Sequence, residues 1–187
     1  MAIAKIIVSG PFGSGKTTLI KHVSDEQFSG KDVPTTGSLA QYKSMTTVGL
    51  DFGILNIDDD LSVHLFGTPG QSRFSFMWKI LSKGALGGVL LVDSASDRAI
   101  GEAQEMIKVW NEIADFPIII GATKQDLPEA ISLEELALKL NSGEIPIFTV
   151  DAREREDNRM LVMGLLQNII LAEEGFTEES FDSLSLE

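Results

Sequence analysis

Residues 10–17 read Gly-Pro-Phe-Gly-Ser-Gly-Lys-Thr and carry the clearest chemical pattern in this sequence. They fit G-x-x-x-x-G-K-[ST], in which the glycines let consecutive backbone N–H groups turn inward and hold phosphate oxygens. Lys16 is then placed to contact β- and γ-phosphates, and the Thr17 hydroxyl to coordinate Mg²⁺. A helix is predicted directly after the segment, and its N-terminal dipole favours a bound anion. The pattern therefore predicts a nucleotide site, without distinguishing ATP from GTP.

Two further segments have the residue types needed to recognise a base. In residues 122–126 (ATKQD), Asp126 can accept hydrogen bonds from both N1–H and the N2 amino group of guanine, a pair of donors that adenine lacks. Lys124 can lay its aliphatic stem over the base. In residues 150–153 (VDAR), the backbone N–H of Ala152 can meet guanine O6. The first segment alone also fits an ordinary turn at the end of a strand, and it gains weight from its place after a strand, far downstream of the phosphate loop. The second segment alone is a weak signal.

The elements that would position these segments alternate between strands and helices. Apolar runs predict strands at residues 3–9, 48–57, 61–66, 85–92, 117–121 and 145–150, the second and third joined as a hairpin by the acidic turn 58–60. Helical spacing predicts helices at residues 16–25, 73–83, 97–113, from Ser132 with a capping box to Glu135, and 157–172, with a long loop at 26–46. This order predicts an α/β fold, with a mostly parallel six-stranded sheet, one antiparallel edge strand and helices on both faces. Ligands of such sheets bind at the carboxyl ends of the strands, where all three segments fall.

Composition narrows the class of protein. The chain has 187 residues, 43% of them hydrophobic, so we expect one folded domain at residues 1–173 and a flexible acidic tail at 174–187. A net charge of −13 disfavours nucleic acid and anionic lipid as partners and leaves either a solvated acidic surface or docking to a basic partner. The sequence has no cysteine, no long apolar run and Ala2 at the second position, so no lipid anchor is expected. A cytoplasmic protein is the expectation, recruited to a membrane only through a partner.

Taken together, the segments resemble the Ras-superfamily small GTPases, over residues 2 to about 172, and so imply a fold of the P-loop NTPase type. Residues 46–52 (TTVGLDF) are similar to the T-I-G-x-D-F segment of Rab-type switch I, which implies that Thr47 closes over the γ-phosphate and Mg²⁺. Residues 66–74 (FGTPGQSRF) resemble the switch II segment D-T-A-G-Q-E-R-F. That match implies that the Gly70 N–H binds the γ-phosphate and that Gln71 orients the attacking water. Residues 123–130 (TKQDLPEA) resemble the Arf-type N-K-Q-D-L-P.

The sequence departs from the superfamily pattern at the metal. Gly67 stands where the family has the switch II aspartate that holds Mg²⁺ through a water. Asp51 and Asp93 are candidate replacements, although such residues more often serve as turn or cap groups. The segment L-F-G-T-P-G-Q resembles the prokaryotic MglA-like GTPases, which are often associated with Roadblock-domain proteins. The resemblance therefore implies GTP or GDP and Mg²⁺ as ligands, and regulatory protein partners that include a Roadblock-domain protein as a candidate.

The predicted activity is slow hydrolysis of GTP by a molecular switch that signals its nucleotide state to a partner. An ATP-dependent enzyme with the same phosphate loop and a nucleotide-bound scaffold without hydrolysis remain alternatives.

Some residues have two interpretations. Arg73 is either an arginine finger or structural, and the aromatic-rich residues 74–78 are either core or a partner surface. His22 and His64 are packing or surface residues. The predicted catalytic residues are Gln71, Lys16 and Thr47, and the predicted metal ligands are Thr17 and Thr47. The predicted nucleotide contacts are Gly10, Phe12, Gly13, Ser14, Gly15, Lys16, Thr17, Thr18, Gly70, Thr123, Lys124, Asp126, Asp151, Ala152 and Arg153.

Overall fold

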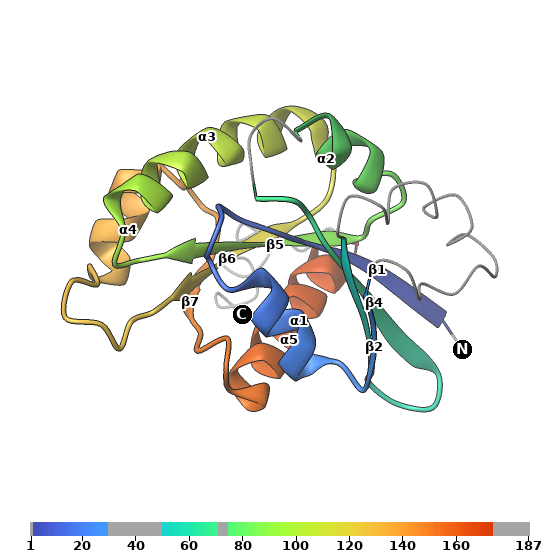
Figure 1. Ribbon diagram of the computed structural model, residues 1–187. Coiled ribbons are helices and arrows are strands. Elements are labelled where there is room, and N and C mark those ends of the chain that lie inside the picture. Colours follow the sequence, from blue (N-terminus) through green and yellow to red (C-terminus); the bar gives the residue numbers. More distant parts are fainter. Residues whose placement is uncertain (1, 30–49, 71–74, 174–187) are drawn as a thin grey trace, which may run out of the picture.

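A computed structural model describes residues 2–29, 50–70 and 75–173, with helices packed on both sides of one twisted sheet (Figure 1). The strands of the described residues are β1 (Ala2–Ser9), β2 (Glu26–Ser29), β3 (Asp51–Asn56), β4 (Leu61–Gly67), β5 (Gly87–Asp93), β6 (Ile118–Thr123) and β7 (Ile147–Thr149). The helices are α1 (Lys16–Val23), α2 (Ser75–Leu81), α3 (Asp97–Ile113), α4 (Leu133–Leu140) and α5 (Arg155–Glu173). The sheet order is β2-β3-β4-β1-β5-β6-β7. The predicted α/β fold with a mostly parallel sheet is confirmed.

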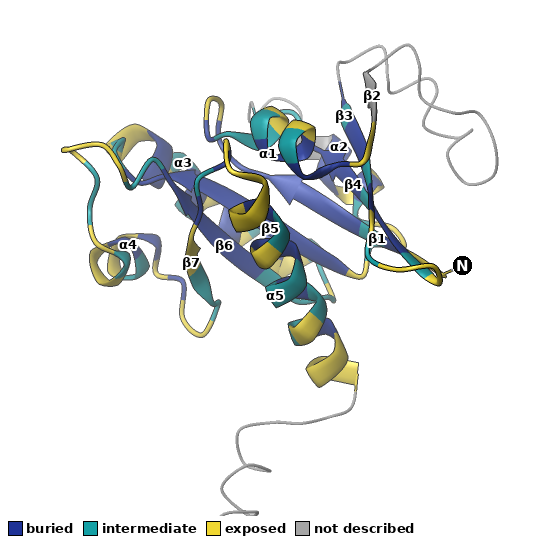
Figure 2. Cartoon of the chain, turned by 90° about the horizontal axis from the view of Figure 1, so that it is seen from below, coloured by how far each residue is buried: buried dark blue, intermediate teal, exposed yellow. Residues whose placement is uncertain are grey.

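The central strands are buried on both faces, as their continuous apolar runs indicate. In β1, Ile7 packs into the core under α2, α3 and α4, whereas its neighbours Ile6 and Val8 pack into the core under α1 and α5. This alternation follows from the two-residue period of a strand. Figure 2 shows the result as a dark blue central sheet between helices whose outer faces are exposed. The central strands thereby hold the loops at their carboxyl ends on a rigid support.

Side-chain caps fix where two of the helices begin. Ser96 accepts a hydrogen bond from the Ala99 N–H at the start of α3, at 3.3 Å. Ser132 accepts one from the Glu135 N–H at the start of α4, at 3.2 Å, which confirms the helix start predicted at Ser132. Such caps satisfy backbone N–H groups that have no partner within the helix.

The predicted number of strands was wrong, and so was the predicted position of the antiparallel strand at the edge of the sheet. Within the described residues the sheet has seven strands, because residues 26–29, predicted as loop, form β2 and pair with β3. The antiparallel strand β3 is consequently second from the edge and runs opposite to both of its neighbours, β2 and β4. The remainder of the predicted loop, residues 30–46, lies outside the described residues, as does the predicted tail at 174–187.

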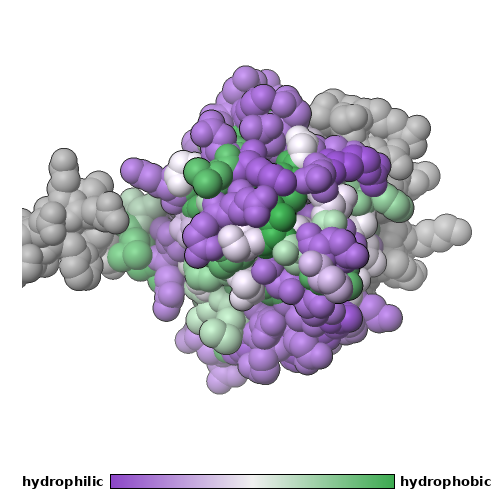
Figure 3. Space-filling view, turned by 90° about the vertical axis from the view of Figure 1, so that its left-hand side faces the viewer, coloured by the Kyte–Doolittle hydropathy of each residue, from purple (hydrophilic) through white to green (hydrophobic). Residues whose placement is uncertain are grey.

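The surface is mainly polar on the side occupied by α4 and β7. Hydrophilic residues dominate this view in Figure 3, and hydrophobic ones form smaller areas between them. Within the described residues, no helix is both long and apolar enough to cross a membrane.

Candidate functional site

The phosphate loop joins the carboxyl end of β1 to the N-terminus of α1. Gly10, Gly13 and Gly15 have φ angles of 146°, 79° and 102°, which L side chains rarely adopt. A Cβ on Gly10 would lie 2.3 Å from the Leu91 carbonyl oxygen, so this residue also has to be glycine for lack of space. The predicted strand–turn–helix context of the motif is therefore present, and its glycines are required by backbone geometry.

The lysine of the loop lies beside the end of β4. Lys16 Nζ donates hydrogen bonds to the carbonyl oxygens of Gly10, at 2.8 Å, and Pro11, at 2.7 Å. A Cβ on Gly70 would lie 2.8 Å from both Lys16 Nζ and the Phe12 nitrogen, so Gly70 is packed directly against the loop. Burial lowers the pKa of Lys16 to about 8, and the negative charge of Asp51 partly opposes this shift. The structure thus brings together Lys16 and Gly70, both of which were predicted to contact the γ-phosphate. We call this part of the site the phosphate end.

The two candidate replacements for the switch II aspartate have different surroundings. Thr17 Oγ1 donates a hydrogen bond of 2.5 Å to Asp51 Oδ2, which places this carboxylate at the phosphate loop. Asp93 instead forms an ion pair with Lys124, at 2.6 Å, and accepts from the Ala95 N–H. Hydroxyl and carboxylate oxygens at Thr17 and Asp51 fit Mg²⁺, a hard cation that takes one or two protein carboxylates together with phosphates and water. The described residues contain no cluster of three or more acidic, histidine or cysteine side chains that would suggest another kind of metal site.

A groove of about 260 Å³ lies beside the phosphate loop. It is lined by Gly13, Ser14, Gly15, Thr18, Thr123, Lys124, Asp126, Leu127, Asp151, Ala152 and Arg153. Three segments that are far apart in the sequence therefore meet in one cavity, at the carboxyl ends of β1, β6 and β7. All of these residues except Leu127 were predicted from the sequence to contact the nucleotide.

Thr123 connects residues 122–126, the segment predicted to recognise the base, to the phosphate loop. Its side chain is buried, and Oγ1 is within hydrogen-bond distance of the carbonyl oxygens of Ser14, at 3.0 Å, and Val92, at 3.1 Å. The next residue, Lys124, adopts a positive φ of 61°, and its ammonium is held by Asp93. The predicted contact residue Thr123 is thus placed to position the two parts of the site relative to each other.

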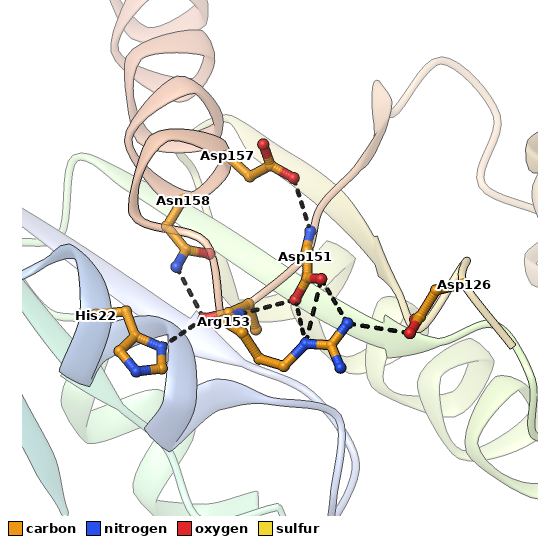
Figure 4. A network of polar contacts seen from close by, with 7 residues as sticks. His22, Asp126, Asp151, Arg153, Asp157 and Asn158 are labelled. Atoms are coloured by element: carbon orange, nitrogen blue, oxygen red, sulfur yellow. Dashed lines mark hydrogen bonds and ion pairs between the residues drawn. The ribbon is translucent and has the colours of Figure 1, made fainter.

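Arg153 bridges the carboxylates of Asp126 and Asp151 (Figure 4). These residues lie in the part of the groove that is predicted to hold the base, which we call the base end. Arg153 binds Asp151 through Nε, at 2.8 Å to Oδ1, and through Nη2, at 2.6 Å to Oδ2. Its Nη2 also donates to Asp126 Oδ2 at 3.0 Å. Hydrogen bonds from Arg153 lower the pKa of Asp151 to about 2, and the two carboxylates raise the pKa of Arg153. The Arg153 guanidinium therefore favours the ionised form of Asp151 and holds the side chains of Asp126 and Asp151 together.

Three residues that hold residues 150–153, the second segment predicted to contact the base, were missed by the sequence analysis (Figure 4). The Ala152 carbonyl accepts hydrogen bonds from His22 Nδ1, at 3.1 Å, and Asn158 Nδ2, at 2.9 Å. Asp157 Oδ2 accepts from the Asp151 N–H at 3.0 Å. The one sequence signal was the acidic first turn of α5, which begins at Arg155 rather than at residue 157 as predicted. His22 was assigned to packing or surface, and its bond to Ala152 gives it a positioning role.

Several predicted residues cannot be placed. Thr47, Gln71 and Arg73 lie outside the described residues, as does Phe74. Of the aromatic-rich stretch after them, Met77 and Trp78 are buried in the core, which agrees with the core interpretation for these two.

Comparison with known proteins gives a family that agrees with this geometry. The ADP-ribosylation factor (Arf) family matches residues 2–164. An uncharacterized protein of Methanocaldococcus jannaschii, MJ1339, is 38% identical over 123 residues, which cover 66% of this chain and 71% of that protein. The mutual gliding-motility protein MglA of Myxococcus xanthus is 28% identical over 157 residues, which cover 77% of this chain and 78% of MglA. The chain therefore belongs to the ADP-ribosylation factor family of the Ras superfamily, and is a GTP-binding small GTPase of the MglA-like type.

Proposed function

We propose that this GTPase is a slow molecular switch, which holds GTP with Mg²⁺, hydrolyses it weakly on its own and signals the bound nucleotide to a protein partner. The observation that carries the proposal is the meeting of the phosphate loop, the Asp126 segment and the Asp151 segment in one groove. Such convergence of three distant segments would supply phosphate and base contacts in a single site.

The base end is proposed to select guanine. The Asp126 carboxylate lines the groove and can accept from the two donors on the guanine edge. In the structure this carboxylate is bound by Arg153, so guanine binding exchanges one charge-assisted hydrogen bond for two. Ala152, held through its carbonyl by His22 and Asn158, is proposed to direct its N–H at guanine O6.

The phosphate end is proposed to carry the reaction. Lys16 stabilises the charge that develops on the γ-phosphoryl oxygens, and Gly70 donates its N–H to the same group. By resemblance to the superfamily, Gln71 orients the attacking water and Thr47 completes the closed site. By the same resemblance, Thr17 and Thr47 would hold Mg²⁺, which would supply further positive charge to stabilise the transition state.

Contacts of the segment after β4 indicate how the nucleotide state would reach a partner. Gly70 touches the phosphate loop, and its neighbour Pro69 accepts a hydrogen bond from Trp78 Nε1 at 3.4 Å. Trp78 stacks on Trp110, with ring centroids 6.1 Å apart and planes within 10°. Loss of the γ-phosphate would release Gly70 and alter this connection to α2, which a partner can read.

Two measurements test the proposal. Competition of GTP and ATP for the purified protein with Mg²⁺ should show a strong preference for GTP, and equal competition would favour an ATP-dependent enzyme instead.

Single-turnover phosphate release should be slow in the wild type and slower in Gln71→Ala, with GTP binding unchanged. Equal rates in the two proteins would contradict the role of Gln71, and no release over hours would favour a scaffold.

The proposed partner is one that distinguishes the two nucleotide states, with a Roadblock-domain protein as the first candidate. Parallel pull-downs with GTP-loaded and GDP-loaded protein should retain it in only one of the two states. Equal retention would contradict the switch. We further propose a cytoplasmic protein that reaches membranes only through such a partner.

A further inference from the structure

The carboxylate missing from the switch II segment has a counterpart on the neighbouring strand. In the antiparallel pair of β3 and β4, Phe52 is paired with Phe66, and Asp51 and Gly67 are the next residues outward on the two strands. A Cβ added to Gly67 would lie 3.1 Å from the Asp51 Cβ. Positions 51 and 67 therefore lie side by side, and a side chain at position 67 would require the Asp51 side chain to shift by a few tenths of an ångström.

The Asp51 side chain reaches the predicted metal ligand. Thr17 Oγ1 donates its hydrogen to Asp51 Oδ2 at 2.5 Å. A threonine hydroxyl that gives its proton to a carboxylate keeps its lone pairs free for a cation. The negative charge of Asp51 would add to the attraction for a divalent ion at this point, in the way that carboxylates around metal ligands tune affinity.

Other carboxylates near the groove have other partners. Asp93 and Asp126 are bound by Lys124 and Arg153 at the base end. Asp151 is held by Arg153 as well. Among the described acidic residues with assigned contacts, Asp51 is the one joined to the phosphate loop.

We propose that Asp51 takes the place of the superfamily's switch II aspartate, and that it supports Mg²⁺ from β3 through Thr17 and its own charge. This inference rests on the proposed function, because it assumes a nucleotide with Mg²⁺ in the site. In this chain the carboxylate that supports the metal would thus come from Asp51 on β3, and not from position 67 on β4.

The test is the release of a fluorescent GDP analogue, measured with saturating Mg²⁺, over a Mg²⁺ titration, and in EDTA. Asp51→Asn keeps the shape and an acceptor for Thr17 but removes the charge. We expect a Mg²⁺ affinity lower by about 10- to 100-fold than in the wild type, the range for loss of a carboxylate that supports a metal ligand. In EDTA the two proteins should release the nucleotide at the same rate. Asp59→Asn, at the exposed turn of the same hairpin, is the matched control and should behave as wild type throughout.

A double variant that exchanges the residues at positions 51 and 67 makes the test more specific. Asp51→Gly combined with Gly67→Asp returns the carboxylate to the superfamily position and removes the Cβ that would crowd it. The flexible Ile20 Cδ1, 3.0 Å from that new Cβ, has to shift. We expect this double variant to recover most of the Mg²⁺ affinity that Asp51→Gly alone loses.

The outcomes separate this inference from the proposed function. An unchanged Mg²⁺ titration in Asp51→Asn would overturn the role of Asp51, and so would an equal acceleration of release with Mg²⁺ and in EDTA, which indicates a structural role. Failure of the wild type itself to hold GDP would overturn the proposed function, and the inference with it.

Discussion

The two ends of the proposed nucleotide site are built in different ways: the phosphate end, at the phosphate loop and Gly70, and the base end, at residues 122–127 and 150–153. At the phosphate end, the shape depends on backbone: glycines with positive φ, and a close approach of Gly70 to the loop that leaves no room for a side chain. At the base end, the shape depends on ion pairs, in which Arg153 joins Asp126 to Asp151 and Lys124 binds Asp93. Steric fit fails abruptly when it is disturbed, whereas exposed ion pairs such as those of Arg153 are individually weak. We therefore expect changes at the phosphate end to abolish nucleotide binding, and changes at the base end to weaken it by smaller steps.

The largest expected effect comes from adding a methyl group at the phosphate end. Gly10→Ala places a Cβ 2.3 Å from the Leu91 carbonyl oxygen, at a φ of 146°. We expect the free energy of unfolding to fall by about 2–4 kcal/mol, as for overpacking combined with backbone strain. GDP affinity should fall by about 100-fold or more, and calorimetry with denaturant unfolding measures both.

Gly101→Ala is the matched control for this change. Gly101 lies in α3, with no atom within 4 Å of an added Cβ. Because alanine favours a helix over glycine by about 1 kcal/mol, the control should be as stable as wild type or more so. A Gly10→Ala protein with wild-type GDP affinity would refute the steric account of the phosphate end.

At the base end, Asp126→Ala should change selectivity more than phosphate binding. Because guanine replaces the Arg153 hydrogen bond to Asp126 with two of its own, the net loss is one hydrogen bond to a charged group. That loss is worth about 1.5–3 kcal/mol and lowers GDP affinity by about 10- to 100-fold. IDP lacks the N2 amino group, so the wild type should prefer GDP to IDP and the variant should lose this preference. Asp115→Ala, an exposed carboxylate after α3, serves as the control. A variant that still prefers GDP would show that another group recognises the base.

A smaller effect is expected where the two ends are joined. Thr123→Val keeps the shape of the side chain but removes the hydroxyl that lies within hydrogen-bond distance of the Ser14 and Val92 carbonyls. The lost bonding is worth about 1 kcal/mol, so GDP affinity should fall by about fivefold. IDP affinity should fall equally, because the change weakens the connection between residues 122–126 and the phosphate loop and leaves the guanine contacts in place.

The exposed Thr149→Val in β7 is the control for this substitution, since it makes the same chemical change outside the groove. Titrations of both nucleotides on both variants measure the effect. A loss confined to GDP would place Thr123 among the base contacts and remove its role in joining the two ends.

The fold was predictable wherever burial imposes a pattern on the sequence. Central strands such as β1 read as continuous apolar runs, and α3 was predicted with its observed bounds, because each must fill a core. Residues 26–29 (EQFS) carry no such pattern. Their strand is decided by backbone pairing with β3, which connects residues far apart in the sequence.

Site residues could be proposed from the sequence where a ligand would fix their spacing. The phosphate loop and Asp126 have recognisable patterns, since phosphates and a guanine edge require particular groups at particular positions. His22 and Asn158 act on the Ala152 carbonyl, and His22 is 130 residues away from it. Any residue with a donor of suitable length can do this, so the sequence gives no signal.

The smallest expected effect is a titration at the base end. The pKa of Asp151 is held at about 2 by Arg153, below its ordinary value of 3.8. A carboxyl whose pKa is lower in the folded state stabilises the fold above about pH 4, and this contribution is lost as the pH falls toward 2. Because the ion pair is exposed, the contribution is small and is best followed at the group itself. In a carboxyl carbon NMR titration, Arg153→Ala should move the Asp151 midpoint up toward 3.8. An unchanged midpoint would show that the charges at this end do not depend on Arg153, and would remove the contrast with the phosphate end.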